Sequence, residues 1–309
     1  MGSAPAKVVL LGEHFVVHGT GALLCAINKR VRVTADIRGD TIRIRSALGD
    51  AVLGPGEALP AGHPLGPLAH LAARAISRFG HKGGLEIAVE SEIPPGVGLG
   101  SSSACCVAAA GALRGLFADP DRADSMAAAL EAERTAFGAA SGADSAACTY
   151  GGIIEYDSIS GHHTVEGPLL RLAVADSGRA HSTAEVVRKV DGFRRDNGAE
   201  FADLCKKVSG LIPRARAAIE GGDLEGLGSC MSENQECLDR IGVSDGVLRS
   251  MVRAGDGPSY GAKVTGAGDG GCVIALADEE CIGRVVESLG AASEGSFAAS
   301  VDPSGLDTF

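Results

Sequence analysis

The segment best suited to hold phosphate is a glycine- and serine-rich stretch between a predicted strand and a predicted helix. It reads PPGVGLGSSSA over residues 94–104. Gly96, Gly98 and Gly100 can adopt backbone angles closed to other residues, so main-chain N–H groups can approach an anion closely. The unpaired N–H groups and the positive dipole end of the following helix strengthen such a site. The segment matches neither a Walker A loop nor a GxGxxG turn, and taken alone it could also be an ordinary serine-capped turn.

Three further segments carry side chains that could act beside a bound phosphate. Residues 5–19 (PAKVVLLGEHFVVHG) place Lys7 before a predicted strand and Glu13 and His14 after it. Residues 263–272 (KVTGAGDGGC) contain four glycines between two apolar strands, a pattern that lets a hairpin press its backbone against a ligand. Asp144 ends the sequence SGAD, eleven positions after Glu133. Each of these residues alone is ordinary, because a loop Asp usually forms a turn and a lone Lys or His is usually solvated.

Composition limits the class of protein. The chain has 309 residues, of which 45% are hydrophobic, enough for a sizeable core. Its formal net charge of −11 argues against nucleic acid or an anionic membrane as a partner. We expect a cytoplasmic protein, since the sequence shows no apolar run of about 18 residues and no secretory pattern. The nine cysteines lack paired CxxC spacing, and we expect reduced core thiols.

Hydrophobic periodicity predicts an α+β protein with two lobes that meet near residues 165–170. Predicted strands cover residues 7–12, 22–37, 85–90, 153–156, 169–176, 262–265, 272–276 and 296–301. Predicted helices cover residues 68–79, 104–117, 123–137, 182–195, 201–220, 224–241 and 247–254. Residues 54–67 and 139–152 are expected to be loops, since the first is rich in Gly and Pro and the second in small residues.

Taken together and in this order, these segments resemble the three motifs of the GHMP small-molecule kinases, and within that family the mevalonate kinases. GEHFVVHG, the SGAD loop followed by TYGG, and SENQECLDRIGVS at residues 232–244 are similar to mevalonate kinases, the last especially to archaeal ones. The resemblance runs from the start of the chain to about residue 276. It implies a ribosomal protein S5 domain 2-like N-terminal lobe (residues 1–168) and a ferredoxin-like C-terminal lobe (residues 169–309), with the active site in the cleft between them.

The resemblance also implies an activity. A mevalonate kinase transfers the γ-phosphoryl group of ATP, with Mg²⁺, to the C5 hydroxyl of (R)-mevalonate, giving 5-phosphomevalonate and ADP. A homodimer is typical of the family, with no nucleic-acid or membrane partner. Alternatives within the enzyme class are mevalonate 3-kinase, the related decarboxylase, phosphomevalonate kinase, homoserine kinase and galactokinase. An alternative of another class is a catalytically silent GHMP-fold sensor.

Residue roles carry over by position in the motifs. Lys7 matches the active-site lysine and Asp144 the catalytic base, while Ser102 and Glu133 match the Mg²⁺ ligands. The residues expected to line the mevalonate pocket are Glu13, His14, Asp144, Thr183 and Gly268. The residues expected to hold the ATP phosphates are Pro95, Gly96, Val97, Gly98, Leu99, Gly100, Ser101, Ser102 and Ser103.

Several positions depart from the family pattern. Ala6 stands where Gly is usual, Ser103 where Ala is usual, and Asp269 where mevalonate kinases usually have Gly. An Asp269 side chain that points inward would repel phosphate or recruit a cation, whereas one that points to solvent would cost little. Cys105 replaces an aromatic substrate contact of animal enzymes. A second phosphate would need extra cations, and we interpret Lys29, Arg30 and Arg32 as a solvated face instead.

Overall fold

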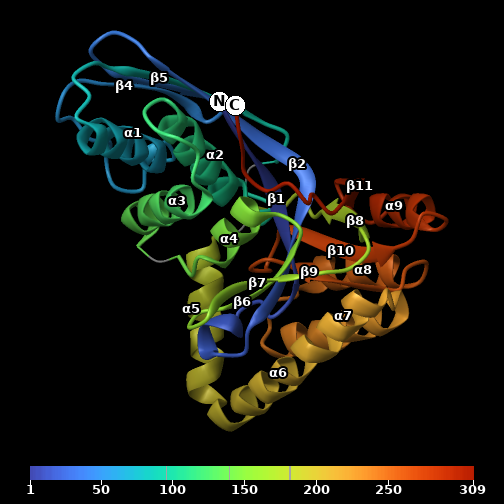
Figure 1. Ribbon diagram of the computed structural model, residues 1–309. Helices are drawn as coiled ribbons and strands as arrows, with labels where there is room; N and C mark the ends of the chain where they lie inside the picture. Colours follow the sequence, from blue (N-terminus) through green and yellow to red (C-terminus); the bar gives the residue numbers. More distant parts are fainter. Residues whose placement is uncertain (95, 139, 181) are drawn as a thin grey trace.

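The computed structural model describes residues 1–94, 96–138, 140–180 and 182–309, which form two lobes built on two β-sheets (Figure 1). The expected two-lobed α+β architecture is therefore confirmed. The two lobes meet where Val9 N–H donates a 2.8 Å hydrogen bond to Thr265 Oγ1, and where Ser300 N–H donates to Asn28 Oδ1 at 3.0 Å. Among the described residues, no helix combines the length and apolar character needed to cross a membrane.

The first sheet is organised around one long strand, β2. The sheet runs in the order β12-β1-β2-β5-β3-β4. In addition, β6 pairs with the first residues of β2, and β7 pairs with β6. Residues 31–37 of β2 pair with β5, and residues 22–25 pair with β6. Its strands are β1 (Gly2–Leu11), β2 (Ala22–Ile37), β3 (Ile42–Ser46), β4 (Gly49–Leu53), β5 (Leu85–Ser91), β6 (Ile153–Asp157), β7 (Gly161–Val165) and β12 (Asp307–Thr308).

Four helices cover one face of this sheet (Figure 1). They are α1 (Gly66–Phe79), α2 (Ser101–Gly115), α3 (Arg122–Phe137) and α4 (Ala143–Tyr150). Helix α2 is rich in Ala and Gly, and these small side chains let it approach β1 so closely that a Cβ on Gly2 would lie 2.2 Å from the Ala108 carbonyl oxygen. The helix thus lies tightly against the strand that carries Lys7.

The prediction of a loop over residues 139–152 is wrong for residues 143–150, where α4 forms. Gly142 at φ 96° precedes this helix and Gly151 at φ 72° ends it. Between them, Ala143, Ala146 and Ala147 pack in a buried cluster with residues of β1 and β2. The sequence interpretation gave the flanking glycines and serines too much weight against the strong helix propensity of alanine.

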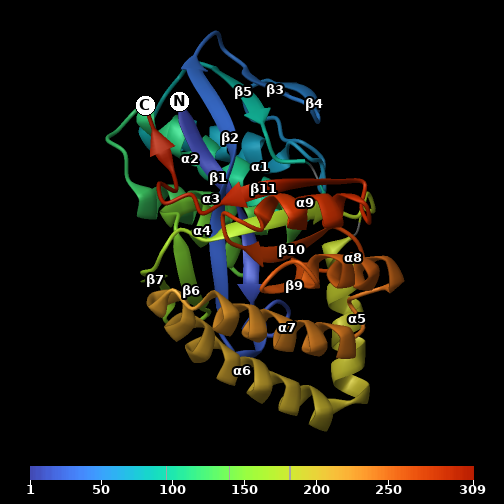
Figure 2. The same cartoon turned by 90° about the vertical axis from the view of Figure 1, so that its right-hand side faces the viewer.

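The second sheet is antiparallel and runs in the order β11-β8-β10-β9. Its strands are β8 (Arg171–Asp176), β9 (Gly261–Thr265), β10 (Cys272–Ala277) and β11 (Gly295–Ser300). The remaining helices are η1 (Val16–His18), α5 (Thr183–Asp196), α6 (Gly198–Gly221), α7 (Leu224–Arg240), α8 (Gly246–Asp256) and α9 (Ile282–Gly290). Figure 2 shows α6 and α7 side by side below this sheet. Sequence patterns did not predict β3, β4, β7, α9 or β12.

The end of the chain returns to the first lobe, so both marked ends lie together in Figure 1. Strand β12 pairs with β1, and Arg30 holds the preceding turn. The Arg30 guanidinium contacts Asp302, lies 3.0 Å from Asp307 Oδ2 and donates to the Gly305 carbonyl oxygen at 2.6 Å. The interpretation of Arg30 as part of a solvated face is wrong, because its side chain is 15% exposed and paired. The lobe boundary at residues 168/169 stays a prediction.

Candidate active site

The ammonium group of Lys7 lies at the centre of the candidate site. Lys7 is part of β1 and is 3% exposed. Its Nζ donates a 3.1 Å hydrogen bond to the Gly98 carbonyl oxygen and lies 3.1 Å from Asp144 Oδ2. The structure thus brings together three segments that the sequence singled out separately: the first motif, the glycine-rich loop and SGAD.

The glycine-rich loop folds over the stem of Lys7. Gly96, Gly98 and Gly100 all have positive φ angles, which glycine adopts without steric cost. A Cβ on Gly100 would lie 2.8 Å from Lys7 Cγ, so only glycine fits there. Ser101 opens α2 directly after the loop, so the first N–H groups of this helix are adjacent to it.

Two hydrophobic side chains of the loop are buried in the protein core. Val97 and Leu99 are buried, and the Leu99 carbonyl oxygen accepts a 3.0 Å hydrogen bond from Lys7 N–H. Pro95, which we predicted to contact ATP, lies outside the described residues. The hydrogen bond from β1 and the two buried side chains therefore fix the conformation of the loop.

Asp144 lies in the first turn of α4, where the helix dipole favours a negative charge. Its side chain is 42% exposed, whereas that of Lys7 is 4% exposed. The pair thus joins a fixed, buried cation to a carboxylate that solvent or a ligand can reach. Such a carboxylate can take a proton from a hydroxyl group placed beside it.

Glu133 is a buried carboxylate between two helices. Its Oε1 accepts a 2.7 Å hydrogen bond from Ser103 Oγ, and its Oε2 accepts one of 2.7 Å from Ser145 Oγ. Burial raises the pKa of Glu133, and the two hydroxyl groups oppose that shift. Ser103 is the buried serine that donates to Glu133, while the predicted ligand Ser102 is exposed. Ser103, the departure from the family pattern, thus has a structural partner.

Glu13 belongs to a buried ion pair that the sequence analysis missed. Its Oε1 contacts the Lys263 ammonium, and its Oε2 accepts a 3.2 Å hydrogen bond from Asn234 Nδ2. Lys263 is fully buried, which lowers its pKa, and it also donates to the Val264 carbonyl oxygen at 2.5 Å. Both oxygens of Glu13 are thus engaged inside the protein, and its predicted place in the mevalonate pocket stays a prediction. A lysine within the apolar strand β9 is the signal that could have predicted a buried carboxylate partner.

His14 connects the first motif to the third. It has φ 61°, and its Nε2–H donates a 2.7 Å hydrogen bond to the Ala267 carbonyl oxygen. Burial lowers the pKa of His14 below its ordinary value, so the ring is neutral at pH 7. Gly268 follows Ala267 in the sequence. It packs so closely against Val243 that a Cβ on Gly268 would lie 2.3 Å from the Val243 carbonyl oxygen.

The two glycine-rich loops also lie against one another. A Cβ on Gly266 would lie 3.2 Å from the Gly98 carbonyl oxygen. Thr183 is the first residue of α5 and is exposed. Asp269 pairs with Lys189 of α5, at 2.7 Å from Oδ2 to Nζ, so its carboxylate has a counter-ion. The Asp that stands where mevalonate kinases usually have Gly is thus paired with a lysine.

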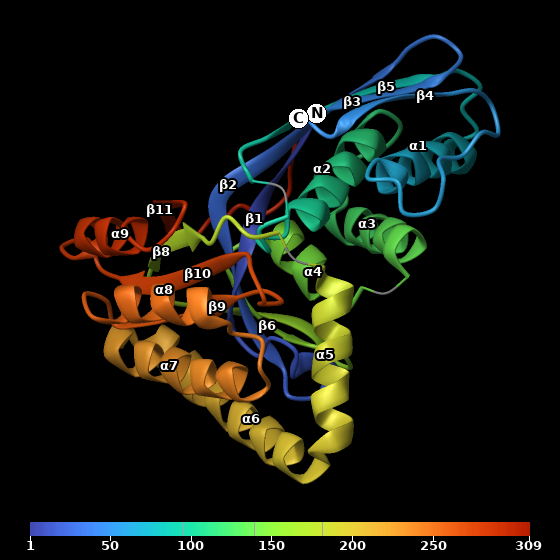
Figure 3. The ribbon, with the colours of Figure 1, turned by 180° about the vertical axis from the view of Figure 1, so that it is seen from behind.

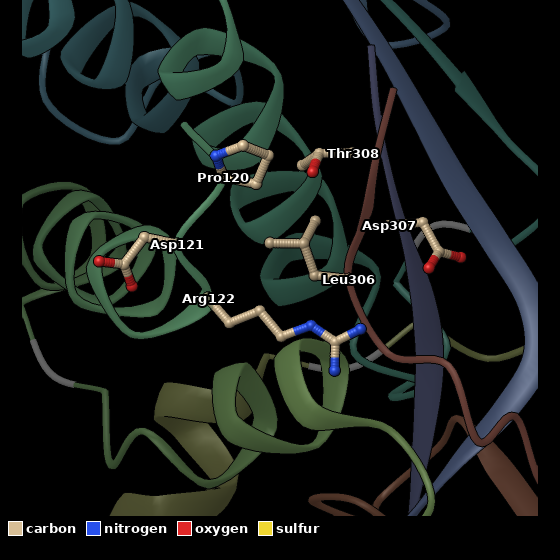
Figure 4. A pocket seen from close by; sticks show the side chains of 6 residues that line it. All are labelled: Pro120, Asp121, Arg122, Leu306, Asp307 and Thr308. Atoms are coloured by element: carbon tan, nitrogen blue, oxygen red, sulfur yellow. The ribbon is translucent and has the colours of Figure 1, made fainter. Parts of the chain in front are cut away.

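A hollow outside this site lies beside the C-terminal strand. Its lining residues are Pro120, Asp121, Arg122, Leu306, Asp307 and Thr308. Figure 4 shows Arg122 extending toward Leu306 while Asp121 points away from it. Among the described residues that we predicted to bind ATP or substrate, none lines this hollow.

Comparisons with known proteins agree with the geometry. The family model described as GHMP kinases N terminal domain matches residues 68–152, and that described as GHMP kinases C terminal matches residues 215–294. The chain is 37% identical over 316 residues to the mevalonate kinase of Aeropyrum pernix, covering 98% of this chain and 96% of that protein. It is 36% identical to the mevalonate kinase of Methanothermobacter thermautotrophicus, covering 93% of each.

Solved structures are similar over the whole chain. The crystal structure of L. major mevalonate kinase in complex with R-mevalonate has a TM-score of 0.84 and 27% identity, covering 98% of this chain and 96% of that one. The Methanococcus jannaschii mevalonate kinase has a TM-score of 0.84 and 25% identity, covering 98% of each chain.

Replacement of Gly100 by alanine should cost more stability than the same change at Gly96. Both glycines have positive φ, φ 74° and φ 78°, so each alanine bears a backbone cost of about 1 kcal/mol. Only at Gly100 does the new Cβ meet Lys7, because nothing lies within 4 Å at Gly96. We expect Gly100→Ala to lose about 1–3 kcal/mol more in the free energy of unfolding, measured by urea denaturation. Equal losses would show that Lys7 moves aside freely.

Replacement of Lys263 by methionine should destabilise the protein by about 3–5 kcal/mol, because it leaves Glu13 buried without a counter-ion. The double variant Lys263→Met/Glu13→Gln removes that charge and should recover much of the loss. Lys206→Met is the control, because Lys206 pairs with Asp203 at the surface and is 78% exposed. Thermal and urea unfolding measure all three, and a double variant no more stable than Lys263→Met would contradict the ion-pair explanation.

Proposed function

The chain belongs to the GHMP kinases and, within them, to the mevalonate kinases, and we propose that it transfers the γ-phosphoryl group of ATP to the C5 hydroxyl of (R)-mevalonate. The observation that carries this proposal is the Lys7–Asp144 pair, 3.1 Å apart at the glycine-rich loop. A reachable carboxylate, a fixed cation and a loop of N–H donors are the parts that phosphoryl transfer to an alcohol requires.

The proposed reaction forms one bond and breaks one. The C5 hydroxyl oxygen attacks the γ-phosphorus, the bond from that phosphorus to ADP breaks, and the hydroxyl proton passes to Asp144. Lys7 orients the Asp144 carboxylate and stabilises negative charge that develops on the attacking and transferred oxygens. Its hydrogen bond to the Gly98 carbonyl oxygen fixes its position relative to the phosphate loop.

We propose that main-chain groups hold the ATP phosphates. The loop at residues 96–100 and the first turn of α2 offer N–H groups, and the helix dipole adds positive potential at the same place. The formal net charge of −11 makes such local donors necessary, because the protein as a whole repels ATP.

The oxygen donors near α2 suit Mg²⁺. Mg²⁺ prefers carboxylate and hydroxyl oxygens with phosphates and waters, and Glu133 is a buried carboxylate beside serine hydroxyl groups. We propose that Glu133 and Ser102 hold the ion, with Ser103 and Ser145 orienting Glu133. When bound, the ion supplies charge neutralisation on the phosphates.

For the acceptor, we propose a pocket formed by His14, Thr183 and Gly268 next to Asp144. The neutral ring of His14 is held by Ala267, and Gly268 lets the loop come close to a ligand. The contacts of Glu13 with Lys263 and Asn234 support this pocket, because they fix the residue that precedes His14. Homodimeric assembly and a cytoplasmic location are further predictions from the family.

The first experiment incubates the purified protein with Mg-ATP and (R)-mevalonate, measures ADP, and locates the phosphate in the product by ³¹P and ¹³C NMR. We expect phosphate on the C5 oxygen. Phosphate on C3, or turnover only with homoserine, galactose or phosphomevalonate, would keep the phosphate machinery and overturn the acceptor assignment. No ADP with any alcohol would favour the sensor alternative.

Asp144→Asn should lower kcat by at least about 10²-fold, because it removes the base while keeping the shape of the side chain. Lys7→Met should be similarly impaired. Isothermal titration with ATP should give Asp144→Asn a Kd close to that of the wild type, and Asp203→Asn on the exposed face of α6 is the control. A near-normal kcat for Asp144→Asn would reject the role of base.

A further inference from the structure

Asp269 is an acidic residue in the middle of a glycine-rich loop, and its carboxylate is paired. It has φ 54°, a conformation that Asp tolerates better than most residues. Lys189 Nζ of α5 donates to Asp269 Oδ1 at 2.9 Å and to Oδ2 at 2.7 Å. The ammonium of Lys189 thus neutralises the charge of Asp269 within the pair.

The backbone of this loop is fixed on two sides. Asp269 N–H donates a 2.8 Å hydrogen bond to the Val243 carbonyl oxygen, and Gly271 N–H donates one of 3.0 Å to the Arg179 carbonyl oxygen. The Asp269 side chain is the part of the loop that reaches α5. It starts two residues after Ala267, whose carbonyl oxygen holds His14.

Helix α5 is held in two ways. Val186 and Val190 are buried in the same cluster as Phe15. Lys189 lies between them in sequence and passes over Gly242, where a Cβ would be 3.8 Å from Lys189 Cε. Figure 3 shows α5 as the upright helix whose upper end lies below α4 and whose lower end meets α6.

We infer that the Lys189–Asp269 pair is a positioning device, which sets the acceptor pocket by joining the loop that holds His14 to the helix that begins at Thr183. This inference rests on the proposed function, since it concerns the mevalonate side of the same site. Asp269 lies in the loop whose Ala267 holds His14, and Lys189 lies on the helix that begins at Thr183, so we expect the pair to act on acceptor binding and to leave ATP binding unchanged.

Steady-state kinetics of four variants test the inference. Lys189→Met and Asp269→Asn should each raise KM for mevalonate by about two- to fivefold, the range that an exposed ion pair allows. Their kcat and their KM for ATP should equal those of the wild type. Lys189→Arg should restore KM, and Arg188→Met is the control, because Arg188 pairs with Glu185 of its own helix and is 71% exposed.

Two further observations distinguish positioning from a merely structural role. The double variant Lys189→Met/Asp269→Asn should be no worse than either single one. Raising the salt concentration should raise KM for mevalonate in the wild type and not in the variants. Unchanged KM in both single variants would overturn the inference. A lower KM for ATP in Asp269→Asn would also overturn it, since Asp269 would then act on phosphate.

Hydrogen exchange separates this inference from the proposed function. Without substrate, Lys189→Met should speed amide exchange over residues 183–189 relative to Arg188→Met. If the wild type fails to phosphorylate mevalonate, the proposed function is wrong, and the exchange result alone decides whether the pair holds α5. Exchange equal to that of Arg188→Met would overturn the inference.

Discussion

The buried ammonium of Lys7 is the interaction on which the arrangement of the site depends. A charge that is taken out of water needs partners, and Lys7 obtains them from the Gly98 carbonyl oxygen and from Asp144. The first partner requires a loop that crosses its stem, which only glycine at position 100 permits. The second requires α4 to begin at the same place, and the small alanines of that helix allow it to lie against β1 and β2. Strand, loop and helix thus meet at one cation, and the Asp144 carboxylate is placed as a result.

Two further lysines of the described part of the chain are already committed to acidic partners. Lys263 neutralises Glu13, and Lys189 neutralises Asp269. In an acidic protein this leaves backbone N–H groups as the main means of attracting a polyphosphate, which explains why glycine loops are so prominent in the site. Such donors are fixed before the ligand arrives, so they stabilise charge in the transition state without reorganisation. The side-chain ion pairs stabilise the fold around the site, and the main chain supplies the proposed contacts with the ligand.

The sequence predicted the features that local patterns record. Alternation in β2 and β5, the helical period of α6 and α7, and the turn between β9 and β10 were all recovered. The motif residues Lys7, Asp144 and Glu133 were placed in one site by resemblance, and the first two lie in contact. Pairings between distant positions could not be predicted. Lys263 and Glu13 are 250 residues apart, and no period or turn signal connects them. Helix α4 was missed because its short length gave flanking glycines more weight than the burial of its alanines.

The contacts of Arg30 with the last residues of the chain have a consequence for how the chain folds during synthesis. Arg30 is made early, yet its partners Asp302 and Asp307 follow it by 272 and 277 positions. Strand β1 likewise gains β12 as a neighbour only when residues 307–308 are present. While the second lobe is being made, the first therefore has an unpaired strand edge and an arginine without its carboxylates. The first lobe therefore completes these pairings only when residues 302–308 have been made, and until then the growing chain has an unpaired strand edge of the kind that promotes aggregation.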